Sequence, residues 1–133
     1  MTFKYNKDSK LRDSMLPNPH FNYGGDASDY SLFSFDNLGA VKLGALIKLG
    51  FADPEECQND SPTIGDILKF LKANPSCTAH GYAVSPERDD YRISVEGVEG
   101  HTGDEQQISA FTKMFRDADD FRAQFGYQYA WYD

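Results

Sequence analysis

The segment from Cys77 to Gly100 constrains the fold most strongly, because its pattern indicates both a secondary structure and a strand register. Its sequence is CTAHGYAVSPERDDYRISVEGVEG, in which two runs containing β-branched and aromatic residues flank a polar stretch. The polar stretch, 85–90, contains Pro86 and several acidic residues, which are residue types that favour turns. The segment therefore predicts an antiparallel β-hairpin, which we place at residues 77–98.

The register of this hairpin is predicted by pairing its largest side chains across the two strands. The resulting pairs are Val84 with Tyr91, Tyr82 with Ile93, and His80 with Val95. We expect this face to point toward the core. The other face then carries small or polar residues, namely Ala79, Gly81, Ala83, Arg92, Ser94 and Glu96. Its small side chains leave a shallow groove, which a helix of this chain is expected to cover, or alternatively a helix of a partner.

Three stretches have apolar residues at intervals of three and four, which is typical of amphipathic helices. The middle stretch has the clearest boundaries, because Ser61 is a capping residue and Pro62 suits the first helical position. Pro75 ends the same stretch, since the residue before a proline disfavours the helical conformation. The predicted helices span residues 36–49, 62–73 and 104–117.

The C-terminal residues 127–132 alternate along the chain in the manner of a β-strand, with Tyr127, Tyr129 and Trp131 on one side. We therefore predict an α+β fold, in which a small antiparallel sheet of the hairpin and this strand is covered by about three helices. Residues 34–133 are predicted to form the single α+β domain.

Residues 1–33 are predicted to form an irregular, extended N-terminal arm, because prolines and a glycine pair interrupt any periodicity. Six aromatic residues are too many for a free tail, so we expect part of the arm to lie across the domain or to pair as an edge strand. These aromatic residues are Phe3, Tyr5, Phe21, Tyr23, Tyr30 and Phe33. The first twelve residues are basic, so one interpretation is that they pack onto the acidic domain. The alternative interpretation is that they bind a partner.

The formal charge of −8 is unevenly distributed along the 133 residues. Residues 1–12 carry a net charge of +3, because they contain four basic side chains and one aspartate. This leaves a net charge of −11 for residues 13–133. An acidic surface repels phosphate, so direct binding of DNA or RNA by the folded domain is not expected. A protein with a basic surface is the better fit as a partner, although acidity also serves solubility alone.

The two cysteines, Cys57 and Cys77, do not indicate a disulfide framework, and no apolar run resembling a signal peptide or a membrane span precedes or follows them. We expect a cytoplasmic protein with reduced thiols, no membrane association and no cofactor. A zinc site built from these cysteines with His80 and His101 would use the Cys77-x-x-His80 spacing, but a second closely spaced ligand pair is missing. Residues 51–62 are acidic without the spacing of a calcium loop.

No sequence motif identifies a reaction. The chain has no nucleophile elbow, and the glycine pair near residue 24 lacks the lysine of a phosphate-binding loop. His80 is the one candidate acid or base, with Glu96 or an acid of residues 117–120 as its partner. The predicted register places His80 and Glu96 on opposite faces, which weakens that pair. We therefore interpret His80 as a histidine hydrogen-bonded within the structure.

These observations favour a non-enzymatic, acidic protein-binding module, such as an immunity, antitoxin or inhibitor-like protein. In a more specific version of this hypothesis, its carboxylates mimic the charge of nucleic acid. One alternative is a small enzyme or ligand-binding protein with a pocket near His80. Another is a homodimer or a structural component of a larger assembly, built on the apolar helix 36–49. The candidate binding residues are Glu87, Arg88, Asp89, Asp90, Arg92, Glu96, Trp131 and Tyr132, with no catalytic or metal-binding residue predicted.

Overall fold

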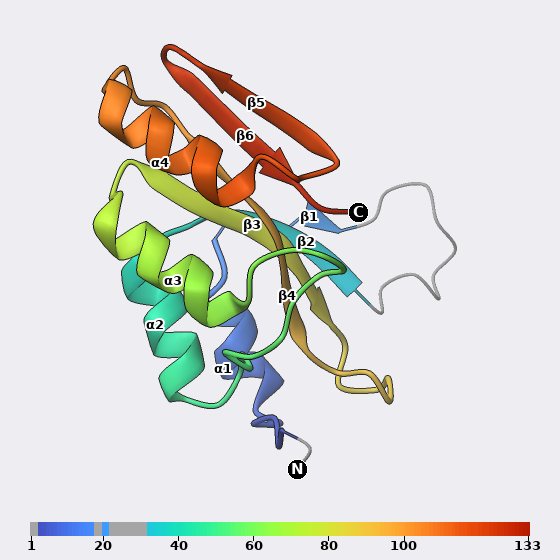
Figure 1. Ribbon diagram of the computed structural model, residues 1–133. Coiled ribbons are helices and arrows are strands. Elements are labelled where there is room, and N and C mark those ends of the chain that lie inside the picture. Colours follow the sequence, from blue (N-terminus) through green and yellow to red (C-terminus); the bar gives the residue numbers. More distant parts are fainter. Residues whose placement is uncertain (1–2, 18–19, 22–31) are drawn as a thin grey trace.

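The computed structural model describes residues 3–17, 20–21 and 32–133 and has an α+β architecture, as predicted (Figure 1). One antiparallel sheet contains six described strands in the order β1-β2-β3-β4-β6-β5. The strands are β1 (His20–Phe21), β2 (Leu32–Leu38), β3 (Cys77–Val84), β4 (Ile93–Gly100), β5 (Asp120–Gln124) and β6 (Tyr127–Trp131). The described helices are α1 (Ser9–Ser14), α2 (Ala40–Lys48), α3 (Ile64–Ala73) and α4 (Glu105–Phe115).

Helices α2, α3 and α4 lie on one face of this sheet (Figure 1). The core between these two layers joins apolar helix side chains to alternate residues of the strands. Among its fully buried members are Leu43 and Leu46 from α2, Ile67 and Leu71 from α3, Phe111 and Phe115 from α4, and Phe35, Ala79, Ala83, Ile93, Val98 and Ala130 from the sheet. Among the described residues, no helix has the length and apolar character needed to span a membrane.

The caps of α3 and α4 explain where these two helices begin. The side chain of Thr63 accepts a hydrogen bond from the backbone N–H of Asp66 at 3.1 Å, and Asp104 accepts from two backbone N–H groups of α4. Ser61, which the sequence suggested as the N-cap of helix α3, instead accepts a hydrogen bond from the backbone N–H of Gln58 within the preceding loop. The predicted helix 62–73 is therefore present and begins at Ile64.

The first predicted helix, 36–49, begins later than expected, because residues 36–38 belong to β2. Gly39 is the N-cap and α2 starts at Ala40. Phe33 and Phe35 alternate toward the core along β2, which is the spacing of a strand. Asn37 has a φ of 59° at an irregularity in the pairing of β2 with β3, and this break separates the strand from the helix.

The sheet is also larger at its other edge than the sequence indicated. Residues 120–124, for which the sequence predicted no element, form β5, and α4 already ends at Phe115 rather than at 117. The predicted C-terminal strand is present as β6, and it pairs with both β5 and β4. Gly126 has a φ of 84° in the turn that joins β5 to β6, a conformation that favours glycine.

The hairpin of β3 and β4 is present, but its predicted register is wrong. Tyr82 pairs with Ser94 and His80 pairs with Gly97, with a bulge between His80 and Gly81. A shift of one residue moves every side chain of β3 to the other face of the sheet. Ala79 and Ala83 therefore face the helices, whereas His80 and Tyr82 point away from the core. The small side chains are covered by the chain's own helices, because α3 approaches β3 closely on that face.

The described part of the N-terminal region packs against the rest of the molecule. Arg12 of α1 is 1% exposed, donates to the carbonyl oxygen of Val84 at 2.8 Å and lies over the ring of Tyr91. The hydroxyl of Tyr91 in turn donates to the carbonyl oxygen of Asn6. The edge pairing expected for this region is seen in β1, which pairs with β2. Tyr23 and Tyr30 lie outside the described residues, and the division into an arm and a domain stays a prediction.

Candidate functional site

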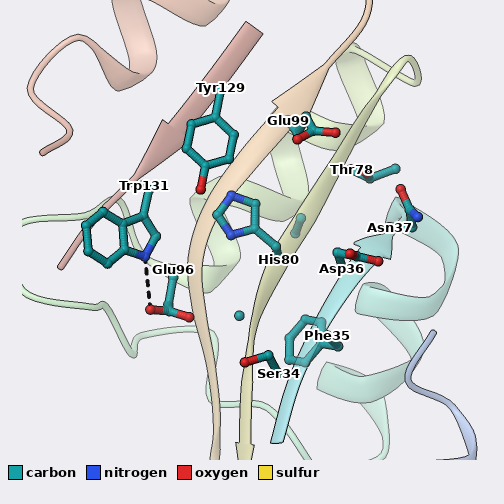
Figure 2. Close-up of a pocket in the computed structure, with 12 residues that line it drawn as sticks. Ser34, Phe35, Asp36, Asn37, Thr78, His80, Glu96, Glu99, Tyr129 and Trp131 are labelled. Atoms are coloured by element: carbon teal, nitrogen blue, oxygen red, sulfur yellow. Dashed lines mark hydrogen bonds between the residues drawn. The ribbon is translucent and has the colours of Figure 1, made fainter. Parts of the chain in front are cut away.

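The face of the sheet opposite α2, α3 and α4 carries polar and aromatic side chains, and we call it the polar face. It is defined by Ser34 and Asp36 of β2, Thr78 and His80 of β3, Glu96 and Glu99 of β4, and Tyr129 and Trp131 of β6. A cavity of about 350 Å³ lies on this face (Figure 2). The cavity is lined by Ser34, Phe35, Asp36, Asn37, Thr78, Ala79, His80, Gly81, Glu96, Glu99, Tyr129 and Trp131. Strands β2, β3, β4 and β6 thus contribute to one site.

His80 lies near the middle of the cavity wall, between the Glu96–Trp131 pair and Glu99 (Figure 2). Its ring is stacked on the ring of Tyr129, with the centroids 5.3 Å apart and an interplanar angle of 6°. Its Nε2 atom lies 3.2 Å from the carbonyl oxygen of Ala130. Because a carbonyl oxygen only accepts hydrogen bonds, Nε2 carries the proton in this contact and Nδ1 is left as an acceptor.

Burial lowers the pKa of His80 below its ordinary value of 6.5, because it disfavours the charged imidazolium. The Ala130 carbonyl and the negative charges of Glu99 and Asp36 act in the opposite direction but do not cancel the effect of burial. His80 is therefore neutral at pH 7 and adds no positive charge to the cavity.

A glycine in β4 makes this position of the His80 ring possible. A Cβ atom at Gly97 would lie 2.8 Å from Cε1 of His80 and 1.8 Å from the carbonyl oxygen of Ala130. Both distances are shorter than real carbon contacts, so a larger residue would displace the ring or separate β4 from β6. Gly97 thus allows the histidine of β3 to cross β4 and contact β6.

Glu96 and Trp131 form a pair at one side of the cavity. The indole Nε1–H of Trp131 donates to Oε2 of Glu96 at 3.1 Å, which is the dashed line in Figure 2. Burial raises the pKa of Glu96, although the hydrogen bond from Trp131 partly opposes this by favouring the carboxylate. The second oxygen, Oε1, makes no hydrogen bond to the described residues, so it remains available as an acceptor.

Glu99 occupies the other side of the cavity and contacts a row of rings. The hydroxyl of Tyr127 donates to Oε2 of Glu99 at 3.4 Å, and Nε2 of His101 lies 3.1 Å from Oε1. The Tyr127 ring stacks on Tyr129 with centroids 6.4 Å apart, so the row begun by His80 continues along β6. Three neighbouring rings are therefore held parallel beside a carboxylate.

The described lining contains three carboxylates, from Asp36, Glu96 and Glu99, and neither lysine nor arginine. A cavity with this lining attracts cations, and the faces of Tyr and Trp rings attract them further. Cys57 and Cys77 are free, and the described residues include no group of three or more histidine, cysteine or acidic side chains that could hold a metal ion. The acidic and aromatic lining of the cavity is thus suited to a cation.

A separate polar cluster, formed by Glu56, Gln58, Tyr82, Arg92 and Ser94, lies beside the N-terminal half of β4. This half of β4 does not pair with β6. The hydroxyl of Ser94 donates to Oε1 of Glu56 at 2.8 Å, and Arg92 donates to the hydroxyl of Tyr82 at 2.8 Å. The other oxygen of Glu56 is buried without a hydrogen-bond partner in the described structure, and burial raises the pKa of this carboxyl. Because Tyr82 also donates to Gln58, the cluster anchors the loop between α2 and α3 to the sheet.

The structure places the eight predicted binding residues in four different positions. Glu96 and Trp131 line the cavity. Glu87 and Asp89 are exposed in the β3–β4 loop, where Arg88 and Asp90 form an ion pair. The loop residues are not part of the cavity lining, and Arg92 belongs to the polar cluster around Tyr82.

Tyr132 is 1% exposed, its hydroxyl donates to Asp117, and it is not part of the cavity lining. It lies on the core side because neighbours in a strand alternate between faces, and Trp131 takes the polar side.

Sequence reasoning missed Glu99 and Tyr129 and placed His80 on the wrong face. The alternation of Tyr127, Tyr129 and Trp131 was a usable signal, since it marks one face of a strand. Glu99 lies opposite Tyr129 in the sheet, a pairing that required the correct register of β4.

Comparisons with models of protein families, with characterised proteins and with solved structures found no match for this chain.

Proposed function

We propose that this protein is a non-enzymatic, acidic protein-binding module, of the kind to which immunity, antitoxin and inhibitor proteins belong, and that it binds a basic partner through the polar face. The observation that carries the proposal is the cavity, in which Glu96 and Glu99 flank aromatic rings without a lysine or arginine in the described lining. Complementary charge increases the rate and specificity of association with a basic protein.

The aromatic residues support an interface as the function of this face. Tyr129 and Trp131 are partly exposed in strand β6, and tyrosine and tryptophan are enriched among residues that dominate binding energy. Both rings are already positioned, because Tyr129 stacks on His80 and Trp131 is hydrogen-bonded to Glu96. A partner therefore does not need to order these side chains on binding, which reduces the entropic cost.

An alternative function is that of a small enzyme or ligand-binding protein with its site near His80. One observation favours it, since His80 and Glu96 line the same cavity rather than opposite faces of the sheet. The described residues provide no hydrogen bond between His80 and a carboxylate, and the Nε2 proton is engaged by Ala130. The Ala130 contact thus engages the proton that an acid–base pair would use, which favours binding of a cationic group over catalysis.

Affinity capture tests the proposal with two charge-matched double variants. The protein is immobilised and exposed to a lysate of its source organism at low and at high salt, and the retained proteins are identified by mass spectrometry. Glu96→Gln/Glu99→Gln removes two charges from the cavity, and Glu87→Gln/Asp89→Asn removes two from the exposed β3–β4 loop.

The proposal predicts a basic protein that wild type and the loop variant retain at low salt, and that the cavity variant loses. Direct binding of the purified partner must show the same order. A partner that both variants retain equally, or the absence of a retained partner at either salt, would contradict the proposal. Tight binding of a small metabolite to the cavity, lost on His80→Ala, would favour the alternative.

A further inference from the structure

We propose that the cavity on the polar face binds the guanidinium group of one arginine side chain of the partner. This inference rests on the proposed function and specifies the chemical group that the site takes. It follows from three properties of the cavity, which are its charge, its unused hydrogen-bond acceptors and its flat walls.

The first property is that the described charges of the cavity favour a cation. Glu96 and Glu99 stand on either side of His80, and His80 itself is neutral because of its burial (Figure 2). A cationic group that enters beside His80 therefore meets two carboxylates and no described positive charge. A carboxylate or phosphate group would be repelled from the same position.

The second property is that two acceptors of the cavity, Oε1 of Glu96 and Nδ1 of His80, are unused by the described residues. Oε1 of Glu96 has no hydrogen-bond partner among the described residues, and the proton on Nε2 of His80 is already directed at Ala130. Guanidinium is the side-chain group that carries five N–H donors and no acceptor. It can satisfy several such acceptors at once, which a single hydroxyl or amide cannot do.

The third property is the arrangement of the rings. Tyr129 and His80 are parallel within 6°, and the hydrogen bond to Glu96 holds the indole of Trp131. A planar guanidinium stacks on aromatic faces and binds carboxylates with two parallel hydrogen bonds, whereas the ammonium of lysine is a compact point charge. The flat indole ring of Trp131 beside Glu96 thus favours arginine over lysine.

The test uses small probes and needs no partner. The protein is labelled with ¹⁵N and titrated with N-acetylarginine amide, with N-acetyllysine amide and with the uncharged N-acetylcitrulline amide. Trp131 is the only tryptophan of the chain, so its indole N–H gives one resonance that reports on the cavity directly. The reporter proton is the one that Trp131 donates to Glu96.

We expect a saturable shift of this resonance with the arginine probe, a weaker response with the lysine probe and none with citrulline. Glu96→Gln should weaken arginine binding by about tenfold or more, because a charge-assisted hydrogen bond is replaced by a neutral one. This variant retains an oxygen that can accept from Trp131. Glu87→Gln, in the exposed loop, should bind as wild type does.

Equal responses to arginine and citrulline, or unchanged arginine binding in Glu96→Gln, would overturn the inference. Melting temperatures and the dispersion of the amide spectrum show whether the variant is folded, so a loss of binding is not confused with unfolding. Failure here is distinguishable from failure of the proposed function. If the cavity variant loses a captured basic partner but the indole resonance ignores arginine, partner binding through this face stands and the guanidinium assignment falls.

Discussion

At the scale of single residues, Gly97 and His80 determine the shape of the polar face. Gly97 lies beneath the imidazole ring, which spans β4 to reach the carbonyl oxygen of Ala130. The ring is neutral because it is buried, and it stacks on Tyr129. A small residue in one strand and a titratable residue in its neighbour thus act together to form the wall of the cavity.

Gly97→Ala should destabilise the protein by about 2–3 kcal/mol, a typical cost of forcing extra volume into a packed region. The reason is that its Cβ would lie 1.8 Å from the Ala130 carbonyl oxygen, a backbone atom that cannot move without separating β4 from β6. Gly39→Ala is the control, since a Cβ there has no neighbour within 4 Å. Urea denaturation measures both, and equal stability of the two variants would contradict the account.

The lowered pKa of His80 predicts a pH dependence of stability. A histidine whose pKa is lower in the folded state than in the unfolded chain binds protons more readily when unfolded. Its contribution is therefore fully present above the ordinary pKa of 6.5 and is lost as the pH falls from there toward the folded pKa. The free energy of unfolding should decrease over this window in wild type.

His80→Gln provides the comparison, because other titrating groups are common to both proteins. The decrease below the ordinary histidine pKa should be shallower in this variant, as measured by denaturation at a series of pH values. An NMR titration of the His80 ring should give a pKa below 6.5. A ring that titrates at or above that value would contradict the structural explanation.

At the scale of elements, the face assignment of β3 is the decisive feature. Ala79 and Ala83 are fully buried beneath the helices, and Thr78 lies on the polar face beside the cavity. The close approach of α3 requires small side chains on the helix side of β3. The large side chains of this strand are consequently directed away from the core.

Ala83→Leu should therefore lower the free energy of unfolding by about 1–3 kcal/mol, because added methylenes enter a filled core. Thr78→Leu adds a leucine to the same strand on the other face, next to a cavity of about 350 Å³. It should be tolerated with a smaller loss. Thermal denaturation compares the two, and the reverse order would show that β3 has the opposite orientation.

The elements differ in how well the sequence predicted them. Apolar spacing predicted α3 closely, and alternation of aromatic residues predicted β6, because both signals are local. The register of β3 with β4 was not local, since it depends on the approach of α3 and on a bulge at His80. Large side chains usually belong in a core, but assigning the large side chains of β3 to the core was wrong here. Because of that error, the sequence did not indicate that His80 and Glu99 line one cavity.

At the scale of the whole molecule, the basic and acidic parts of the chain have different positions. Lys7 and Arg12, from the basic N-terminal residues, both lie over the ring of Tyr91 and away from the cavity lining. The acidic side chains of β4 remain on the polar face. The charge asymmetry seen in the sequence thus becomes a surface with a cation-attracting cavity, which is the basis of the proposed binding of a basic partner.

Assembly into a homodimer remains an alternative at this scale. Val41 of α2 is 88% exposed, and it lies beside an apolar groove that Leu71 and Pro75 also line. Sedimentation of the purified protein decides whether copies associate, and a monomer would leave the polar face as the surface for a partner.

The most direct test of the central claim is the NMR signal of the Trp131 indole in ¹⁵N-labelled protein when the unlabelled partner is added. The indole belongs to the only tryptophan of the chain and lines the cavity. We predict that its resonance shifts or broadens in proportion to the bound fraction, while the amide of Glu87 in the β3–β4 loop is unaffected. A partner that binds while the indole resonance stays unchanged would contradict the account.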